Sequence, residues 1–344
     1  MKNFIVFFFI VMVISFLTPN LFIHDVIAIE KISLSELDSS KIIDNLKEKL
    51  DLPDEGKTEK IEKIKLLLTD TNQIVELSFD DYIKGVLIGE MPASYELEAL
   101  KAQALVARTY TLYKLQNGKN VHDGADMCDD INCCQCFRTK EYAFASWDDS
   151  GEQAKWLKIE EAVNATKNQC ITYDNEIIAA FFHANSGGKT EDVKYIWGEV
   201  EIPYLKSVAG YERDLDEETK TFKIDEFENL IKEKYDSYQY DSGELKVIDY
   251  TTSGRANSIQ LGDITLKATE LRTLLSLKST NINIEFNDEE VIIKTNGYGH
   301  GVGMSQVGAN QMALDGKMYD EIVKHYYTDV EIKTISWRVF GGDV

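Results

Sequence analysis

Basic residues are scarce in this sequence: 37 lysines and arginines stand against 59 aspartates and glutamates, so the formal net charge is −22. Binding nucleic acid needs a basic surface against the phosphates, and this charge therefore excludes nucleic acid as an expected partner. Proline is scarce too, with 4 in 344 residues, and no low-complexity tract or internal repeat is visible. These absences argue against long disorder, and the length suits one large or two ordinary domains. A substrate that is neutral or only patchily charged fits better.

Long hydrophobic runs are missing except at the N-terminus. There Lys2 precedes residues 4–17, which are almost wholly apolar. Such a run fits either one membrane anchor or the apolar region of a cleaved signal peptide. Because no small-x-small cleavage site is convincing before Ala28, we expect a retained anchor over residues 1–28. The bulk of the chain would then lie outside the cytoplasm.

Beyond the anchor, the patterns predict a spacer followed by an α+β domain. Residues 29–60 are polar and acidic and read as a juxtamembrane spacer, and residues 61–344 form the main domain, with an α+β subdomain at roughly 210–295. We expect a strand hairpin turning at 69–72, helices from Asp80 to 87, from Ser94 to about 115, over 160–167 and over 222–234, strands at 170–173 and 176–182, and a closing strand within 328–340. The fold class is therefore α+β, with mixed helices and antiparallel strands around a central cleft.

Cysteine is limited to five residues, four of which crowd into residues 128–136 while Cys170 stands apart. Crowding of this kind is poor geometry for two ordinary disulfides and suits a metal better. Tetrahedral zinc takes four nitrogen or sulfur ligands, and a site filled entirely by protein ligands is structural. The soft ligands available here number more than four: His122, Cys128, Cys133, Cys134 and Cys136. Disulfides formed after export are the alternative interpretation.

Glu90 is the candidate acid. It ends an apolar helical segment and is followed by Met91 and Pro92. Partial desolvation there would raise the pKa of its carboxyl and make it a usable general acid near neutral pH. The alternative is a surface glutamate at a helix end.

The helix that follows carries three polar candidates for a cleft above Glu90. Their spacing places Gln103 and Tyr110 on one face, and Arg108 lies between them. In the alternative interpretation, Gln103 is solvated and Arg108 is an ion-pair partner.

The stretch FFHANSGGKTEDVKYIWG covers residues 181–198 and places a histidine three residues before a serine. It lacks the Gly-x-Ser-x-Gly pattern of a nucleophile elbow, because Ala184 and Asn185 precede the serine. We expect Ser186, Gly187 and Gly188 to form a tight loop whose backbone N–H groups and hydroxyls face a ligand. A turn without a ligand is the alternative.

The segment GYGHGVGMSQVGA contains His300, Ser305 and Gln306. It lacks the Rossmann pattern, so a nucleotide site is rejected. The many glycines imply that the backbone approaches another segment or an extended ligand closely.

Together these motifs resemble stage II sporulation protein D and its relatives. The resemblance rests on GEMPASYELEALKAQALVARTY, on FFHANSGGKTED with IWG, on PYLKSV and on GYGHGVGMSQVGANQMALDG, in that order. It covers nearly the whole chain from about residue 64. It implies a lytic transglycosylase that cleaves peptidoglycan glycan strands during spore engulfment and prefers strands already stripped of stem peptides.

The resemblance also implies roles for individual residues. Glu90 falls on the catalytic glutamate, which would protonate the bond between N-acetylmuramic acid and N-acetylglucosamine and leave a 1,6-anhydro end. The glycan-cleft positions would include Gln103, Arg108, Ser186, Gly187, Gly188, His300, Ser305 and Gln306. Zinc would be held by His122, Cys128, Cys133 and Cys134, with Cys133 in place of the histidine that is usual in the family and Cys136 as an extra candidate.

Partners and location follow from the same resemblance. Stage II sporulation proteins P (an amidase) and M would be partners, and the anchored chain would act in the space between the mother-cell and forespore membranes. A non-catalytic glycan-binding scaffold that activates a cell-wall amidase is the alternative function. A zinc-dependent hydrolase is disfavoured, because catalytic zinc keeps one position open for water.

Overall fold

The computed structural model describes residues 61–118, 122–147, 151–198, 200–241 and 245–335, all within one compact unit, Glu59–Gly342. The anchor and spacer predicted for residues 1–28 and 29–60 lie outside the described residues. Within the described ranges, none of the helices combines the length and the apolar character that crossing a bilayer requires.

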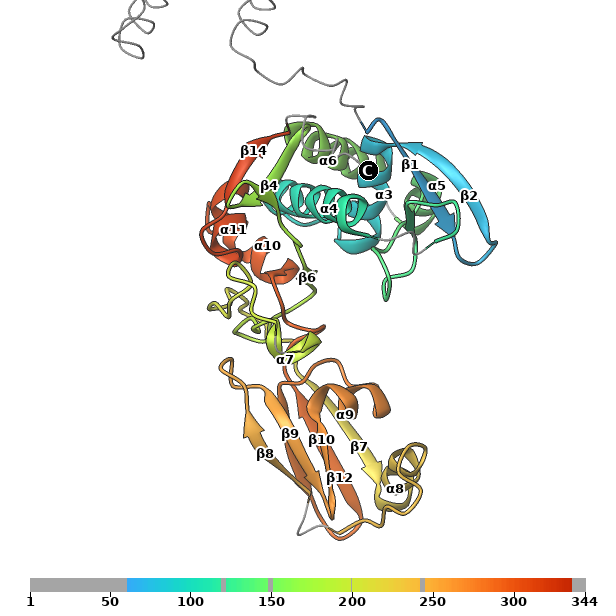
Figure 1. Cartoon of the computed structure of the whole chain (residues 1–344), viewed down its shortest axis with the longest axis vertical. Helices are drawn as coiled ribbons and strands as arrows, with labels where there is room; N and C mark the ends of the chain where they lie inside the picture. Colours follow the sequence, from blue (N-terminus) through green and yellow to red (C-terminus); the bar gives the residue numbers. More distant parts are fainter. Residues whose placement is uncertain (1–60, 119–121, 148–150, 199, 242–244, 336–344) are drawn as a thin grey trace, which may run out of the picture. The chain divides into compact units, whose positions relative to one another are not determined.

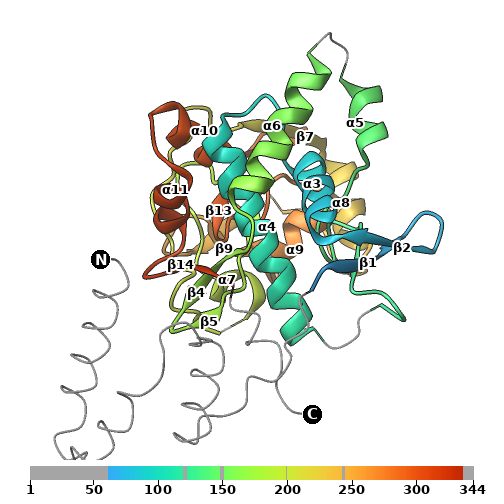
Figure 2. The same ribbon diagram turned by 90° about the horizontal axis from the view of Figure 1, so that it is seen from above.

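The first hydrophobic core is built around α4 (Leu97–Asn117), a helix that is buried on several sides. Its buried residues include Ala99, Ala102, Ala104 and Ala107, whose small side chains let neighbouring helices approach closely. The helices packed on it are α3 (Phe79–Glu90), α6 (Glu152–Ala165), α10 (Gln306–Leu314) and α11 (Tyr319–Tyr326). Figure 2 shows α4 among these helices. This helix is therefore apolar on most of its circumference.

Short sheets border this core and bring distant segments together. The predicted hairpin is confirmed: β1 (Lys63–Leu68) pairs antiparallel with β2 (Gln73–Ser78), and β3 (Met127–Cys128) adds parallel to β1. A second sheet has the order β14-β4-β5, from Glu331–Thr334, Gln169–Tyr173 and Glu176–Ile177. Most important for the site, β6 (Phe182–His183) pairs parallel with β13 (Met304–Ser305), so two motifs far apart in sequence lie side by side.

A second hydrophobic core lies within the segment between Phe222 and Ile293. Its two antiparallel sheets have the orders β10-β9-β8 and β11-β12-β7. The strands are β7 (Glu218–Lys223), β8 (Lys246–Tyr250), β9 (Ala256–Leu261), β10 (Ile264–Lys267), β11 (Ile282–Phe286) and β12 (Glu290–Thr295). Figure 1 shows the helices α8 (Ile224–Lys232) and α9 (Ala268–Leu274) beside these strands. The two helices contribute the buried Phe227, Ile231 and Leu271 to this core. The mixture of helices with mainly antiparallel strands agrees with the α+β class.

Two predicted helix starts were wrong. The side chain of Ser78, rather than Asp80, caps α3 by accepting the N–H of Asp81 at 3.1 Å. The next helix begins at Leu97, with Glu96 as its N-cap instead of Ser94. No side chain caps it, and the N–H of Glu96 donates to Asn310 on α10 at 2.8 Å. Tertiary packing therefore replaces a local cap here.

Other boundaries also differ from the predictions. The helix expected over 160–167 already begins at Glu152. Phe222 belongs to β7 rather than to the following helix, because its ring is buried in the second core. The strand expected over 176–182 is interrupted after Ile177, and residues 182–183 pair with a different partner.

Candidate functional site

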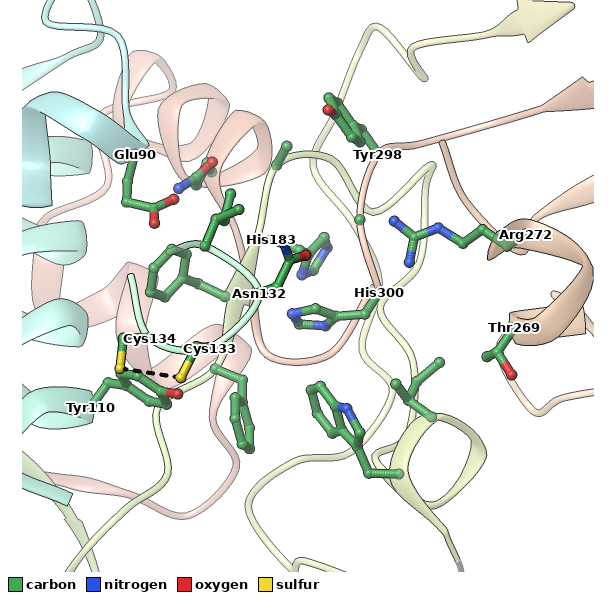
Figure 3. A pocket seen from close by; sticks show the side chains of 18 of the residues that line it. Glu90, Tyr110, Asn132, Cys133, Cys134, His183, Thr269, Arg272, Tyr298 and His300 are labelled. Atoms are coloured by element: carbon green, nitrogen blue, oxygen red, sulfur yellow. Dashed lines mark hydrogen bonds between the residues drawn. The ribbon is translucent and has the colours of Figure 1, made fainter. Parts of the chain in front are cut away.

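Four segments line a cavity of about 740 Å³. They are the motif at residues 181–198, the glycine-rich motif that contains His300, the cysteine-rich residues 128–136 (the cysteine loop), and α9. Figure 3 shows Glu90 on one side of the cavity, Arg272 on the opposite side, and His183 with His300 between them. The residues that line it are Gly89, Glu90, Tyr110, Ile131, Asn132, Cys133, Cys134, Phe181, Phe182, His183, Ala184, Ile196, Trp197, Thr269, Arg272, Thr273, Thr280, Tyr298, Gly299, His300 and Gln306. Its lining is aromatic and polar, with few charges, which suits a sugar chain better than a highly charged ligand.

Glu90 is the last residue of α3, and its carboxyl is largely shielded from water. Burial raises the pKa of this carboxyl to about 7, and the Cys136 N–H, which donates to it at 2.7 Å, together with the nearby Gln306 side chain only partly opposes that shift. Near neutral pH both protonation states are therefore populated. A group in this condition can give a proton and later take one back.

Two glycines on α3 allow the cysteine loop to pack beside Glu90. A Cβ atom at Gly85 would lie 2.0 Å from the Phe137 ring, and one at Gly89 would lie 2.7 Å from the Cys136 carbonyl oxygen. The N–H of Arg138 also donates to the Gly85 carbonyl at 3.0 Å. The loop is thus fitted against one face of α3, and this packing places the Cys136 N–H on the Glu90 carboxylate.

The predicted zinc ligands come together in this loop. The ligand atoms of His122, Cys128, Cys133 and Cys134 all lie within 4.8 Å of one another. His122 Nε2 is 3.4 Å from Cys134 Sγ and 3.6 Å from Cys133 Sγ, and the two sulfurs are 3.9 Å apart. Zinc–sulfur bonds of about 2.3 Å in a tetrahedron would separate neighbouring ligand atoms by roughly 3.8 Å.

The donor set therefore fits zinc both in chemistry and in size. Cys136, the extra candidate, is not part of this group, because its backbone is turned toward Glu90. All five cysteines are unpaired in the structure.

His183 and His300 are held in defined tautomers by the backbone of one residue, Val302. The Nδ1 of His183 donates to the Val302 carbonyl at 3.1 Å, and the Val302 N–H donates to Nδ1 of His300 at 3.0 Å. The proton of His300 is therefore on Nε2, whereas Nε2 of His183 is a bare acceptor without a partner. Burial lowers the pKa of His183 well below its usual value. Burial, followed by the charges of Arg272 and Arg255, lowers the pKa of His300 to about 4. Both rings are neutral at physiological pH.

Aromatic side chains form a further wall of the cavity. The ring centroids of Phe181 and Trp197 are 4.6 Å apart, and those of Trp197 and His300 are 5.0 Å apart. Trp197 remains half exposed, with 50% of its surface accessible. An exposed indole at the edge of a cavity offers a face on which a sugar ring can stack.

The structure brings only some of the predicted cleft residues to the cavity. Four of them line it: Glu90, Tyr110, His300 and Gln306. The other six do not line it: Gln103, Arg108, Ser186, Gly187, Gly188 and Ser305. Arg108 is buried and pairs with Asp80 at 3.0 Å, as the alternative interpretation held. Gln103, contrary to the solvated alternative, is fully buried.

The Ser-Gly-Gly loop contacts other segments of the protein and does not line this cavity. Gly187 has φ +65°, and a Cβ there would lie 2.8 Å from the Asn296 carbonyl oxygen. The Ser186 N–H donates to Glu212 at 2.9 Å, and the Ser305 hydroxyl donates to the same carboxylate. Ser305 in addition caps α10 by accepting the Gly308 N–H at 3.2 Å. The loop thus packs against other segments of the chain, and its contact with a ligand stays a prediction.

The same motif joins the two cores. The carboxylate of Glu191 accepts the hydroxyls of Thr251 at 2.6 Å and Ser253 at 2.7 Å. The buried guanidinium of Arg255 donates to the Ser186 carbonyl. These bonds hold the segment that leads to α9 against the motif.

The cavity residues that were not predicted include His183, Trp197, Arg272 and Tyr298. His183 and Trp197 lie inside the motif at residues 181–198, so this motif could have indicated them as site residues. Tyr298 belongs to the glycine-rich segment. No local sequence pattern indicates that Arg272 is a site residue, because it lies in a helix of ordinary composition.

Comparison with known proteins agrees with the motifs. A family model described as stage II sporulation protein matches residues 68–173. The chain is 36% identical over 266 residues to stage II sporulation protein D of Bacillus subtilis (strain 168), covering 76% of each chain. It is 34% identical over 272 residues to the protein of the same name from Bacillus amyloliquefaciens, covering 77% of this chain and 76% of that one.

A more distant relative is the amidase enhancer of Bacillus subtilis (strain 168), 28% identical over 301 residues, which cover 71% of this chain and 39% of the relative. The two sporulation proteins extend over most of the described domain, and over most of their own length as well. The chain belongs to the stage II sporulation protein D family.

Proposed function

We propose that this protein is a lytic transglycosylase that cleaves the glycan strands of peptidoglycan during sporulation. The observation that carries the proposal is Glu90, whose pKa is about 7 in an aromatic, polar cavity. Glu90 holds the sole carboxylate among the described residues that line this cavity. Ordinary glycosidases need two carboxylates, because one must activate water or attack the sugar itself.

One carboxylate is sufficient when the sugar supplies its own nucleophile. The protonated Glu90 gives its proton to the glycosidic oxygen between N-acetylmuramic acid and N-acetylglucosamine, and an oxocarbenium-like state develops at C1. The ionised Glu90 then takes the proton of the C6 hydroxyl, whose oxygen bonds to C1. The C1–O bond to the leaving sugar breaks and a 1,6-anhydro ring forms, with no net proton change. A pKa of about 7 suits both steps.

The other residues of the cavity have supporting roles in this proposal. Trp197 and Phe181 offer stacking surfaces for sugar rings, and the neutral rings of His183 and His300 line the cavity between Glu90 and Arg272. Zinc held by His122, Cys128, Cys133 and Cys134 would supply structural support alone. It would hold the cysteine loop, which carries the N–H on Glu90.

The decisive experiment uses peptidoglycan strands stripped of their stem peptides. We expect the full chain to release fragments with 1,6-anhydro-muramyl ends, identified by mass spectrometry. Glu90→Gln should lose this cleavage, while Glu201→Gln, which changes a glutamate with an 81% exposed side chain, should keep it. Ordinary reducing ends, or turnover retained in Glu90→Gln, would contradict the mechanism.

A second candidate function is a non-catalytic glycan-binding activator of a cell-wall amidase. The 28% identity to an amidase enhancer favours it. In that case stripped strands would bind without being cleaved, and an amidase would act faster in the presence of the Glu90→Gln chain. Stage II sporulation proteins P and M are the partners we propose on family grounds. A retained N-terminal anchor would place the domain between the mother-cell and forespore membranes.

A further inference from the structure

Arg272 lies at the edge of the cavity and has no acidic partner among the residues that the structure describes. It projects from α9, and Figure 3 shows its guanidinium directed toward the side of the cavity that holds His183 and His300. Its Nε donates to the Leu277 carbonyl at 3.2 Å, which orients the group and leaves the terminal nitrogens available. Across the described ranges, no carboxylate is found in an ion pair or hydrogen bond with it.

The surroundings make this charge notable. Burial lowers the pKa of Arg272, and the positive charge in turn helps to keep His300 neutral. A half-buried guanidinium remains charged, so it loses hydration without gaining a counter-ion. Among the described residues that line the cavity, it is the one side chain that carries a positive charge at neutral pH. In a chain of net charge −22, a cation without a carboxylate partner points to a negatively charged ligand group.

The polar neighbours of Arg272 define the kind of anion. Thr269 and Thr273 lie on α9 with Arg272, and Thr280 and His300 line the same cavity. These groups are uncharged, and together they supply few donors besides the guanidinium. A single carboxylate, which Arg binds in a bidentate manner, suits such a site better than a phosphate that requires several cations.

We propose that Arg272 binds the free lactyl carboxylate of a muramic acid residue in a strand whose stem peptide has been removed. This inference rests on the proposed function. When the stem peptide is attached, the lactyl carboxyl is an amide, which has no charge and leads into a bulky chain. Removal of the peptide exposes the carboxylate. An amide would leave the guanidinium desolvated and unpaired, and this penalty would select against unstripped strands.

The architecture explains how this residue is positioned. The buried Ala268 and Leu271 anchor α9 in the second core, and the Glu191 and Arg255 bonds fix that core to the Ser-Gly-Gly motif. The first core contributes the acid, and the second contributes the group that reads the substrate. Arg272 is therefore a specificity residue and has no part in the proton transfers.

The test measures binding instead of turnover. The full chain carrying Glu90→Gln is titrated in a calorimeter with a peptide-stripped muramoyl tetrasaccharide and with chitotetraose, which has the same length but no lactyl group. Adding Arg272→Gln should weaken binding of the muramoyl ligand by about 10- to 100-fold, the usual loss for a charge-assisted hydrogen bond. Affinity for chitotetraose should change by less than about 2-fold. The matched control is Arg213→Gln, which removes an arginine with a 74% exposed side chain and should alter neither affinity.

A second measurement keeps the arginine and changes the ligand, so that it does not depend on how the variant folds. A muramoyl tetrasaccharide whose lactyl carboxyl is converted to a primary amide should bind the Glu90→Gln chain about 10- to 100-fold more weakly than the free acid. Equal affinity for acid and amide, or equal loss for both glycans on Arg272→Gln, would overturn the inference and leave the proposed function standing. Failure of every glycan to bind would overturn both.

Discussion

At the residue scale, the candidate chemistry depends on how burial changes two ionisable groups. Glu90 is shielded by the cysteine loop and by Gln306, so its carboxyl holds a proton near neutral pH. Arg272 is desolvated as well, but a guanidinium cannot release its proton in this range. Burial therefore makes one group a proton donor and leaves the other a fixed charge.

The raised pKa of Glu90 predicts a pH dependence of stability. The folded state holds this proton with a pKa of about 7, against 4.5 for an ordinary glutamate carboxyl, so it binds the proton more tightly than the unfolded state does. The free energy of unfolding should consequently decrease between about pH 4.5 and pH 7 and then level off. Glu90→Gln removes this cost, and it should be more stable than the parent by about 2–3 kcal/mol at pH 8 but nearly equal at pH 4.5. Urea unfolding at both pH values measures the difference.

Glu201→Gln is the matched control for this prediction. Glu201→Gln should follow the parent at both pH values, because that side chain is exposed. A Glu90→Gln chain that is less stable at pH 8 would show that the ionised carboxylate is well stabilised in the fold. Cleavage by the parent should also decline above pH 7, as the acid loses its proton.

At the element scale, the cysteine loop is the segment that shapes the acid's environment. It contacts α3 through Gly85 and Gly89, and it carries three of the four clustered ligands. The loop has little regular structure, apart from the two residues of β3. A bound metal would therefore stabilise the conformation of this loop, as backbone hydrogen bonds stabilise a helix or a strand.

Metal removal should test this arrangement. We expect the purified full chain to contain one equivalent of zinc by elemental analysis. Cys128→Ser should lose it and show a lower melting temperature, because three ligands hold zinc less well than four. Cys170→Ser changes a buried cysteine outside the cluster and should retain the metal. Full zinc content in Cys128→Ser, or loss in Cys170→Ser, would contradict the ligand set.

At the scale of the whole molecule, the cavity needs both cores. Glu90 belongs to an element of the first core and Arg272 to an element of the second. Their relative placement depends on the buried Glu191, which binds two hydroxyls next to Arg255. The contacts of Glu191 and Arg255 at this junction between the cores thus determine whether Glu90 and Arg272 can contact the same glycan strand.

Glu191→Gln is the variant that tests this junction. It preserves the shape but removes the charge that balances Arg255, and its amide group would face two hydroxyls that now donate to the carboxylate. Loss of one partner of a buried polar contact should lower the free energy of unfolding by about 2–4 kcal/mol, and the affinity for stripped strands should fall with it. Urea unfolding and calorimetry measure the two effects. Stability and affinity equal to those of Glu201→Gln would show that the junction does not depend on this charge.

Local patterns predicted the parts of the site that are close together in sequence. Crowding indicates His122 and the four cysteines of residues 128–136 as candidates, the resemblance leaves out Cys136, and the structure brings the remaining four together. The hairpin and its turn followed from residue types. In contrast, Ser94 and Asp80 were chosen as caps on local preference and were wrong, because contacts from Asn310 and the side chain of Ser78 satisfy those helix starts.

The serine motif shows the limit of such reasoning most clearly. Ser186, Gly187 and Gly188 have the composition of a ligand-binding loop, but they contact Glu212, Asn296 and Arg255 from later parts of the chain. Nothing in the local sequence distinguishes a loop that faces a ligand from one that faces another segment. Both need glycines that permit close approach.

By itself, the sequence determined the α+β class, the elements with strong periodicity, the metal-ligand cluster and the motifs of the family. Only the tertiary structure decided that Glu90 is desolvated, that His183 and His300 both bond to the backbone of Val302, and that no carboxylate of the described residues pairs with Arg272. The reason is physical. Turns, caps and nearby ligands depend on neighbours along the chain, whereas burial and charge balance depend on segments that meet only when both cores are folded.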